Sequence, residues 1–231
     1  MKYSTIFLDL DDTLIDTIHN TVETVEEIYN DYHLSKYFDS FDDFYKNTFR
    51  PNNLFLWKEY EHQRISKEYL LHNRFIRTFG AIDEISDEHA LEINRDYLKR
   101  VVRKPTLIPG CIEILKYLKP KYRICILSNG FTEMQYDKIK NADLTDYFDD
   151  VILSDMVGIN KPQRGIFDYA IKQTGICEEE VIMIGDNYST DITGAHGAGI
   201  DQIWYNPKNL SIEGFVPTHT VNNLQEIKNI L

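Results

Sequence analysis

The sequence predicts an α/β protein in which a doubly wound, Rossmann-like parallel sheet carries an inserted all-helical domain. Along the second half of the chain, short apolar runs alternate with amphipathic segments, which is the pattern of βα units with helices on both faces of a parallel sheet. One earlier apolar run precedes a long polar and aromatic stretch with helix-like spacing. We therefore expect residues 1–16 and 103–231 to form a discontinuous α/β core, and residues 17–102 to form a helical insertion after its first strand.

The first half of the chain contains one predicted strand followed by helices. Residues 4–8 form an apolar run with the length of a buried strand, and this run ends at Asp9. Helical spacing, with Ser or Thr near several of the starts, follows at 17–32, 41–49, 66–79 and 86–101. Pro105 and Pro109-Gly110 then end this pattern.

The second half of the chain reads as alternating strands and helices. The strand-like apolar runs lie at 123–127, 151–153, 181–184 and 200–204. Helical segments are expected between them, near 132–142, 164–174 and 190–198. The carboxyl ends of all these strands should meet at one edge of the sheet, where open α/β sheets bind their ligands.

Composition excludes several classes of partner. The net charge of -12 argues against nucleic-acid polymers and anionic membranes, because both need a basic surface. A small phosphorylated substrate needs only a local pocket of positive charge. Cys111, Cys125 and Cys177 are odd in number and form no CxxC pair, so we expect reduced thiols. Without a secretory pattern or an apolar run of about 18 residues, the expected location is the cytoplasm; the oligomeric state stays open.

Two aspartates stand directly after the first predicted strand. Asp9 and Asp11 are two residues apart where the chain leaves the strand, so a loop can direct each carboxylate separately. Two acidic groups at the end of a strand are costly to hold together unless a cation or a proton lies between them. This layout suits Mg²⁺-assisted acyl-phosphate chemistry, although an Asp-x-Asp triplet alone often arises by chance.

Two further motifs follow the next two strands. Ser128-Asn129-Gly130 offers a hydroxyl and backbone N–H groups at the start of a helix, which suits an anion cradle, although the motif taken alone favours a plain helix cap with a glycine turn. Lys161-Pro162 follows the run at 151–153. Because the Lys-Pro pair occurs elsewhere in the chain, only its place in the order of strands and helices gives it meaning.

The fourth motif is the most specific of the set. Gly185-Asp186 follows the run at 181–184, and Asp191 comes five residues after Asp186. A simpler interpretation is a turn in which Asp191 stabilises the first turn of a helix through the helix dipole. The order of the four motifs, each closing a successive hydrophobic run, is much harder to obtain by accident than any one of them.

With these motifs in this order, the sequence resembles the haloacid dehalogenase-like hydrolase superfamily over essentially the whole core. The helical insertion resembles the cap of the first subfamily. The resemblance implies that all four motifs surround one site, with the strand of Asp9 central and the strand of Asp186 beside it. Asp11 favours the phosphatases of the superfamily, because its dehalogenases lack a carboxylate at this position.

The resemblance also implies a role for each motif residue, in a Mg²⁺-dependent hydrolysis of phosphomonoesters. Asp9 would be the nucleophile that forms an aspartyl-phosphate, and Asp11 the general acid and base. Asp191 would orient Lys161 or a metal-bound water. The phosphate-binding residues would be Thr13, Ser128, Asn129 and Lys161. The Mg²⁺ ligands would be Asp9, the backbone carbonyl of Asp11, and Asp186.

The C-terminal part resembles one branch of the superfamily, the pyrimidine 5′-nucleotidases. The resemblance rests on residues 199–207, which include Trp204-Tyr205-Asn206-Pro207, and on residues 217–221 with Leu224. It implies a small phosphorylated metabolite as substrate, a pyrimidine nucleoside 5′-monophosphate. This element is expected to lie away from the substrate and to indicate kinship.

The helical insertion offers weaker support for a nucleotide. Between Tyr29 and Tyr60, 11 of 32 residues are aromatic, against 13% in the whole chain. Aromatic rings can stack on a base, but they can also fill the small core of a helical domain. The candidate substrate-selecting residues of the insertion are Phe49, Arg50, Asn52, Asn53 and Trp57.

Three alternatives remain from the sequence. A sugar-phosphate phosphatase or phosphomutase would share the core, because the insertion decides selectivity. A phosphoacceptor signalling module also combines acidic residues, a hydroxyl and a Lys-Pro, but it would lack Asp186, Asp191 and the large insertion. A catalytically silent regulatory relative would be expected to have lost a motif carboxylate, and all are present here.

Overall fold

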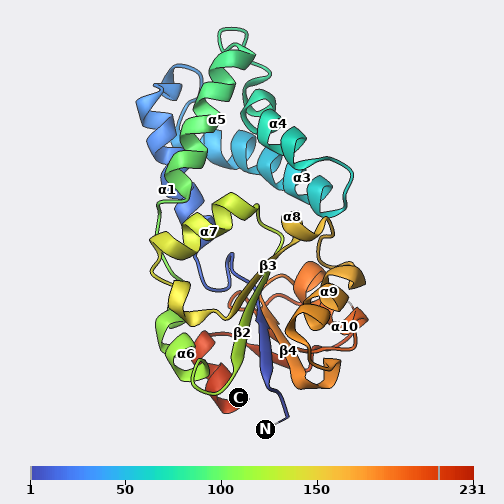
Figure 1. Cartoon of the computed structure of the whole chain (residues 1–231). Coiled ribbons are helices and arrows are strands. Elements are labelled where there is room, and N and C mark those ends of the chain that lie inside the picture. Colours follow the sequence, from blue (N-terminus) through green and yellow to red (C-terminus); the bar gives the residue numbers. More distant parts are fainter. Residues whose placement is uncertain (1, 213) are drawn as a thin grey trace. The chain divides into compact units, whose positions relative to one another are not determined.

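The computed structural model, which describes residues 2–212 and 214–231, has a single parallel sheet among these residues. Its six strands lie in the order β3-β2-β1-β4-β5-β6. Figure 1 shows β1 in dark blue between β2 and β4. The strands are β1 (Thr5–Leu8), β2 (Arg123–Ser128), β3 (Asp150–Leu153), β4 (Val181–Gly185), β5 (Asp201–Tyr205) and β6 (His219–Val221). The predicted α/β fold class is thereby confirmed.

The first strand of the chain is central in the sheet. Phe7 of β1 pairs with Cys125 of β2 on one side and with Met183 of β4 on the other, both in parallel. Asp9 and Asp186 therefore follow neighbouring strands, as the family resemblance implies. Ser128 ends β2, on the opposite side of β1. Three of the four motifs are thus brought to the same edge of the sheet by strand order alone.

Helices cover both faces of the sheet, because successive side chains of β1 point to opposite faces and need cover on each. Ile6 and Leu8 face a core that includes Leu115 and Ile227, whereas Phe7 faces the opposite core, which includes Phe167. The helices of this part are α6 (Cys111–Leu118), α7 (Thr132–Asn141), α8 (Ser154–Val157), α9 (Arg164–Thr174) and α10 (Thr193–Gly197), with a π-helical turn η5 (Tyr188–Ile192) and 3-10 turns at Thr145–Tyr147, Glu178–Glu180 and Leu224–Asn229.

The chain divides into two compact units. The core unit comprises Met1–Thr17 and Pro105–Leu231, and the helical unit comprises Ile18–Lys104. The two segments through which the chain leaves and re-enters the core unit lie side by side. Ile15 forms an antiparallel bridge with Leu107, and the backbone N–H of Asp16 donates to the carbonyl of Thr106 at 3.0 Å. The insertion therefore starts and ends at neighbouring segments that are hydrogen-bonded to each other.

The helical unit is built from four long helices and several short turns. Ser66 and Ser86 cap α4 and α5 by accepting a backbone N–H three residues on. The elements are α1 (Thr17–Asp31), α2 (Phe41–Asp43), α3 (Arg50–Glu61), α4 (Lys67–Phe79) and α5 (Asp87–Val101), with a 3-10 turn at Leu34–Lys36 and a π-helical turn η2 (Phe44–Phe49). The sequence pattern does not predict α3, which has Pro51 in its first turn and buries only Leu56 and Tyr60.

Aromatic side chains form much of the core of the helical unit. The Phe44 and Phe79 rings stack with centroids 6.1 Å apart. Phe49 is 1% exposed and packs against Phe75 at 5.3 Å and Tyr97 at 5.8 Å. The alternative that these aromatics fill a small core therefore holds for Phe49.

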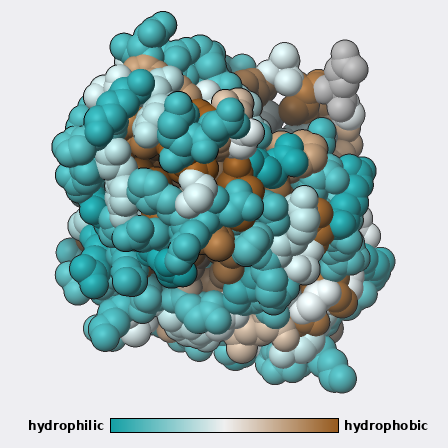
Figure 2. Space-filling view, turned by 90° about the horizontal axis from the view of Figure 1, so that it is seen from above, coloured by the Kyte–Doolittle hydropathy of each residue, from teal (hydrophilic) through white to brown (hydrophobic). Residues whose placement is uncertain are grey.

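The surface is largely polar on the side shown in Figure 2, with hydrophobic side chains showing between hydrophilic ones. This agrees with the net charge of -12. Among the described residues, no helix combines the length and the apolar character needed to cross a membrane.

Candidate active site

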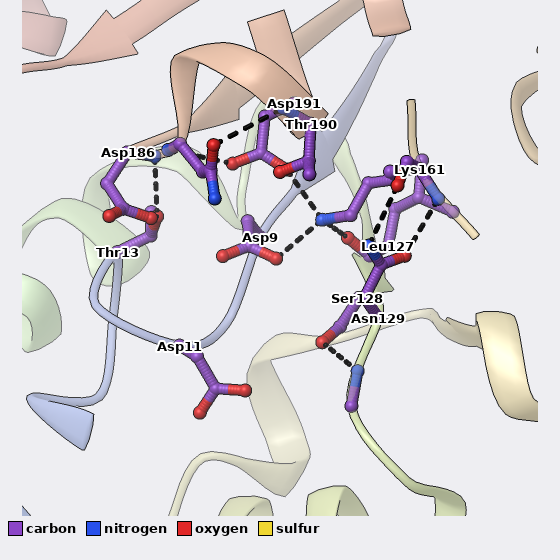
Figure 3. Close-up of polar contacts among 12 residues, drawn as sticks. Asp9, Asp11, Thr13, Leu127, Ser128, Asn129, Lys161, Asp186, Thr190 and Asp191 are labelled. Carbon is purple, nitrogen blue, oxygen red and sulfur yellow. Dashed lines mark hydrogen bonds and ion pairs between the residues drawn. The ribbon is translucent and has the colours of Figure 1, made fainter. Parts of the chain in front are cut away.

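The loop after β1 directs Asp9 and Asp11 to different surroundings. The backbone N–H of Asp9 donates to Ile184 at 2.9 Å, so Asp9 still belongs to the ladder between β1 and β4. The chain then turns through Asp12, whose φ of 58° is left-handed, and Leu14 donates back to Leu10 at 3.0 Å. As Figure 3 shows, the Asp9 carboxylate points toward Lys161, and the Asp11 carboxylate lies apart from it.

Lys161 is a buried ammonium group at the centre of the site. It is 2% exposed, and its Nζ donates at 2.6 Å to each of three oxygens: Asp9 Oδ1, Asp191 Oδ1 and the carbonyl of Leu127 (Figure 3). Burial lowers the pKa of Lys161, but the charges of Asp191 and Asp9 outweigh it, so the pKa is raised and the group stays charged. The contact with Asp191 is the one that the sequence prediction anticipates.

Asn129 holds Lys161 in place through the lysine's backbone. Its Nδ2 donates to the Lys161 carbonyl at 2.9 Å, and its Oδ1 accepts the Lys161 N–H at 2.8 Å. The amide oxygen and one proton of the NH₂ group are engaged in this way. Asn129 therefore positions Lys161 in addition to any contribution it makes to phosphate binding.

Thr13 fixes the position of Asp186. The Thr13 hydroxyl donates to Asp186 Oδ1 at 3.2 Å and accepts the Asp186 N–H at 3.0 Å. On the other side, the indole N–H of Trp204 donates to the Asp186 carbonyl at 2.8 Å. The Trp204 element, which the sequence suggests as a mark of kinship only, is thus bonded to the backbone of the site.

Gly185 allows Asp191 to approach the end of β4. A Cβ at residue 185 would lie 2.2 Å from Asp191 Oδ2, which is closer than any side chain tolerates. The same Oδ2 accepts the backbone N–H of Asn187 at 3.1 Å. The glycine that precedes Asp186 therefore leaves room for the second carboxylate of the motif.

Three carboxylates of the site could share a cation. Asp9, Asp186 and Asp191 each offer one oxygen, and these oxygens lie within 4.8 Å of one another. The sequence prediction includes Asp9 and Asp186 in the metal site, whereas the Asp11 side chain is not part of this cluster. Asp191 already engages Lys161 through Oδ1.

The electrostatics of the cluster fit a bound cation. Burial, together with the charges of Asp191 and Asp11, raises the pKa of Asp9 to about 8 even though Lys161 lowers it. Burial and the charge of Asp9 raise the pKa of Asp186 well above its usual value. Buried carboxylates that repel one another are stabilised by a divalent ion, and a small all-oxygen set suits Mg²⁺.

The Asp11 carboxylate is surrounded by donors that the sequence prediction misses. Lys138 Nζ donates to its Oδ1 at 2.5 Å, the Thr17 hydroxyl donates to the same oxygen, and Gln135 Nε2 donates to its Oδ2 at 2.7 Å. Burial by itself raises the pKa of Asp11, but Lys138 and the other donors outweigh it, so the pKa is lowered. Gln135 and Lys138 have an i, i+3 spacing on the helix after Ser128, which places them on one face, but this spacing alone does not distinguish a buried face from an exposed one.

The parallel sheet, with a buried lysine and a carboxylate cluster at the carboxyl ends of its strands, defines a Rossmann-like α/β protein with a candidate active site at that edge. The chain belongs to the haloacid dehalogenase-like hydrolase family, whose model matches residues 3–199.

Comparison with known proteins gives relatives over the full length of the chain. The pyrimidine 5′-nucleotidase YjjG of Escherichia coli (strain K12) is 30% identical over 233 residues, covering 100% of this chain and 99% of the relative. The pyrimidine 5′-nucleotidase PynA of Streptococcus pneumoniae (strain ATCC BAA-255 / R6) is 30% identical over 239 residues, covering 100% of this chain and 98% of the relative. The chain is thus an enzyme of a hydrolase family with phosphatases among its relatives.

A solved structure supports the fold. The crystal structure of the HAD-hydrolase YfnB from Bacillus subtilis bound to magnesium has a TM-score of 0.87 to this chain at 23% identity. The match covers 100% of this chain and 99% of that one. Both the sheet and the helical unit therefore have counterparts in a known fold.

Proposed function

We propose that the protein is a Mg²⁺-dependent phosphatase that hydrolyses pyrimidine nucleoside 5′-monophosphates through an aspartyl-phosphate. The observation that carries the proposal is the contact of Lys161 with both Asp9 and Asp191, next to Asp186. This arrangement offers a buried carboxylate, held in one orientation, beside a permanent positive charge. Asp9, Asp186 and the backbone carbonyl of Asp11 would hold Mg²⁺, which supplies charge stabilisation for a phosphoryl group.

In the first step, an oxygen of Asp9 attacks phosphorus and the bond from phosphorus to the alkoxide leaving group breaks. Asp11 donates its proton to the departing oxygen. In the second step, Asp11 takes a proton from a water molecule that attacks the aspartyl-phosphate, which releases inorganic phosphate and restores Asp9. Lys161 offsets negative charge on the phosphoryl group, and the Ser128 hydroxyl donates to one of its oxygens.

Asp11 needs different protonation states in the two steps. Its contact with Lys138 favours the ionised form, which is the form that accepts a proton from water. The first step requires the protonated form. Asp11 is therefore expected to loosen its contact with Lys138 when a leaving group is present.

The nucleotide assignment is supported by the two relatives named as pyrimidine 5′-nucleotidases. It is supported further by polar and aromatic residues on α3. Arg50 is exposed, and the half-buried Trp57 contacts Tyr60 edge-on at 5.8 Å. Asn53 accepts the Nε–H of the buried Arg74 at 3.0 Å, and Asn52 donates to the carbonyl of Thr48 at 3.1 Å. We infer that Arg50, Asn52, Asn53 and Trp57 select the substrate, and that Phe49 acts only by packing.

A substrate panel tests the assignment. With Mg²⁺ present, kcat/KM is measured for UMP, dUMP, CMP, purine nucleoside 5′-monophosphates, and hexose and triose phosphates. Pyrimidine nucleotides should rank first. If sugar phosphates exceed UMP and dUMP by about tenfold or more, the nucleotidase assignment is wrong while the phosphatase assignment stands. Absence of hydrolysis with every compound, p-nitrophenyl phosphate included, contradicts the phosphatase itself.

A further inference from the structure

Gln135 joins two groups to which the proposed mechanism gives different tasks. It lies on α7 and is fully buried. Its Nε2 lies 2.7 Å from Asp11 Oδ2 and 2.7 Å from Ser128 Oγ. One amide nitrogen therefore contacts both the acid–base carboxylate and the phosphate-binding hydroxyl.

The chemistry of these groups fixes the direction of each hydrogen bond. An ionised carboxylate can only accept, so the Gln135 group that faces Asp11 is the NH₂. An NH₂ group has two protons, and the second is available to Ser128 Oγ. Ser128 Oγ also accepts the backbone N–H of Gly130 at 3.1 Å. With two donors to its oxygen, the Ser128 hydroxyl must direct its own proton elsewhere.

The hydroxyl proton of Ser128 is left to point into the site. Among residues 2–212 and 214–231, the structure records Ser128 Oγ only as an acceptor. Figure 3 shows the hydroxyl on the side of β2 where Asp9 and Asp11 lie. A phosphoryl oxygen bound at Asp9 is an acceptor that this proton would meet.

The backbone at residue 130 makes room for Gln135. A Cβ there would lie 2.2 Å from Gln135 Nε2 and 2.3 Å from its Cδ. The amide thus crosses closely over Gly130, in the space that the absence of a side chain leaves. The glycine of the Ser128-Asn129-Gly130 motif accommodates this glutamine.

We propose that Gln135 is a positioning residue whose amide turns the Ser128 hydroxyl into a dedicated donor to the phosphoryl group and, with its other proton, holds Asp11. The proposal rests on the proposed phosphatase function. The positioning role of Gln135 differs from a packing role. A residue that only fills space would change the stability of the protein and would not change phosphate binding through Ser128.

The test measures the binding of inorganic phosphate in the presence of Mg²⁺ by isothermal titration calorimetry, together with the hydrolysis of p-nitrophenyl phosphate. Gln135→Met keeps the length of the side chain and removes its donor, and it should weaken phosphate binding about tenfold. Gln135→Glu places an acceptor beside Ser128, draws the hydroxyl proton away, and should weaken binding further. The matched control is Gln173→Met on α9, an exposed glutamine of the same unit, which should change neither quantity.

A double-mutant cycle with Ser128→Ala separates positioning from packing. If Gln135 acts through Ser128, adding Gln135→Met to Ser128→Ala should change phosphate affinity by less than about twofold. Effects that multiply, or an unchanged phosphate affinity in folded Gln135→Met, overturn the inference. If both glutamine variants fail to fold, Gly130→Ala takes their place, because its side chain removes the space for the Gln135 amide. Gly130→Ala should then weaken phosphate binding as much as is expected of Gln135→Met. An unchanged phosphate affinity in Gly130→Ala would overturn the inference. A wild-type protein that binds phosphate but turns nothing over contradicts the proposed function and leaves this test of Gln135 intact.

Discussion

Asp9 is the side chain on which the proposed chemistry depends most directly. Asp9→Asn replaces the attacking carboxylate by a neutral amide and removes a proposed metal ligand, so steady-state phosphatase activity should be abolished. Asp11→Asn keeps the backbone carbonyl and should spare metal binding, while the loss of acid–base catalysis lowers kcat about 10²–10⁴-fold. Both are measured with p-nitrophenyl phosphate and UMP. Activity of Asp9→Asn near the wild-type level would rule out the covalent mechanism.

The carboxylate cluster predicts how the metal site depends on pH. The pKa of Asp9 is raised to about 8, chiefly by burial, and that of Asp186 is raised in the same direction. Protons therefore compete with Mg²⁺ below about pH 8, and metal binding should release protons. Calorimetric titration should give a weaker Mg²⁺ affinity at pH 6 than at pH 8.5, and removal of Mg²⁺ by EDTA should abolish turnover. A Kd independent of pH over this range would contradict the site.

Among the elements, α3 carries the candidate residues for selectivity. Trp57→Ala should narrow the preference for UMP over a hexose phosphate and leave p-nitrophenyl phosphate hydrolysis nearly unchanged, because only the nucleotide offers a base for stacking, worth about 1–3 kcal/mol. Phe55 on the same helix is 47% exposed and lies against Arg77, so Phe55→Ala is the matched control. An equal change in both variants would mean that Trp57 acts through the stability of α3 and not through the substrate.

Helices and strands whose apolar residues repeat with one clear period are predictable from this sequence, and elements without such a repeat are not. The spacing predicts a helix over 164–174, and α9 spans Arg164–Thr174. By contrast, α3 has no continuous apolar stripe, and β6, with three residues at the sheet edge, is too short to show a period. In the site, Asp9, Ser128 and Asp186 are predictable because each stands at or directly after the end of a predicted parallel strand, and Lys161 is predictable from its place in the order of the motifs. Gln135 and Lys138 are not, since long polar residues on a helix ordinarily lie in solvent.

At the scale of the whole molecule, the bridge between Ile15 and Leu107 pairs the two segments that flank the insertion, so a short turn can replace the insertion. Replacing residues 18–104 by a short Gly-Ser turn keeps Thr17, which contacts Asp11. The shortened chain should fold and should hydrolyse p-nitrophenyl phosphate, but it should lose discrimination between UMP and ribose 5-phosphate. Thermal melting and the ratio of the two kcat/KM values measure this. A retained nucleotide preference would place selectivity in the core unit.

The central place of β1 has a consequence for the order in which the protein forms during synthesis. Thr5 is synthesised before the helical unit, yet its sheet partners Arg123 and Val181 are synthesised after it. The helical unit, by contrast, is one continuous stretch whose contacts are complete once Lys104 has emerged. The helical unit is therefore expected to fold before the sheet, because β1 has no partner strand until β2 and β4 have been synthesised. A nascent chain that stops before β4 is thus expected to carry a folded helical unit and an unfinished catalytic sheet.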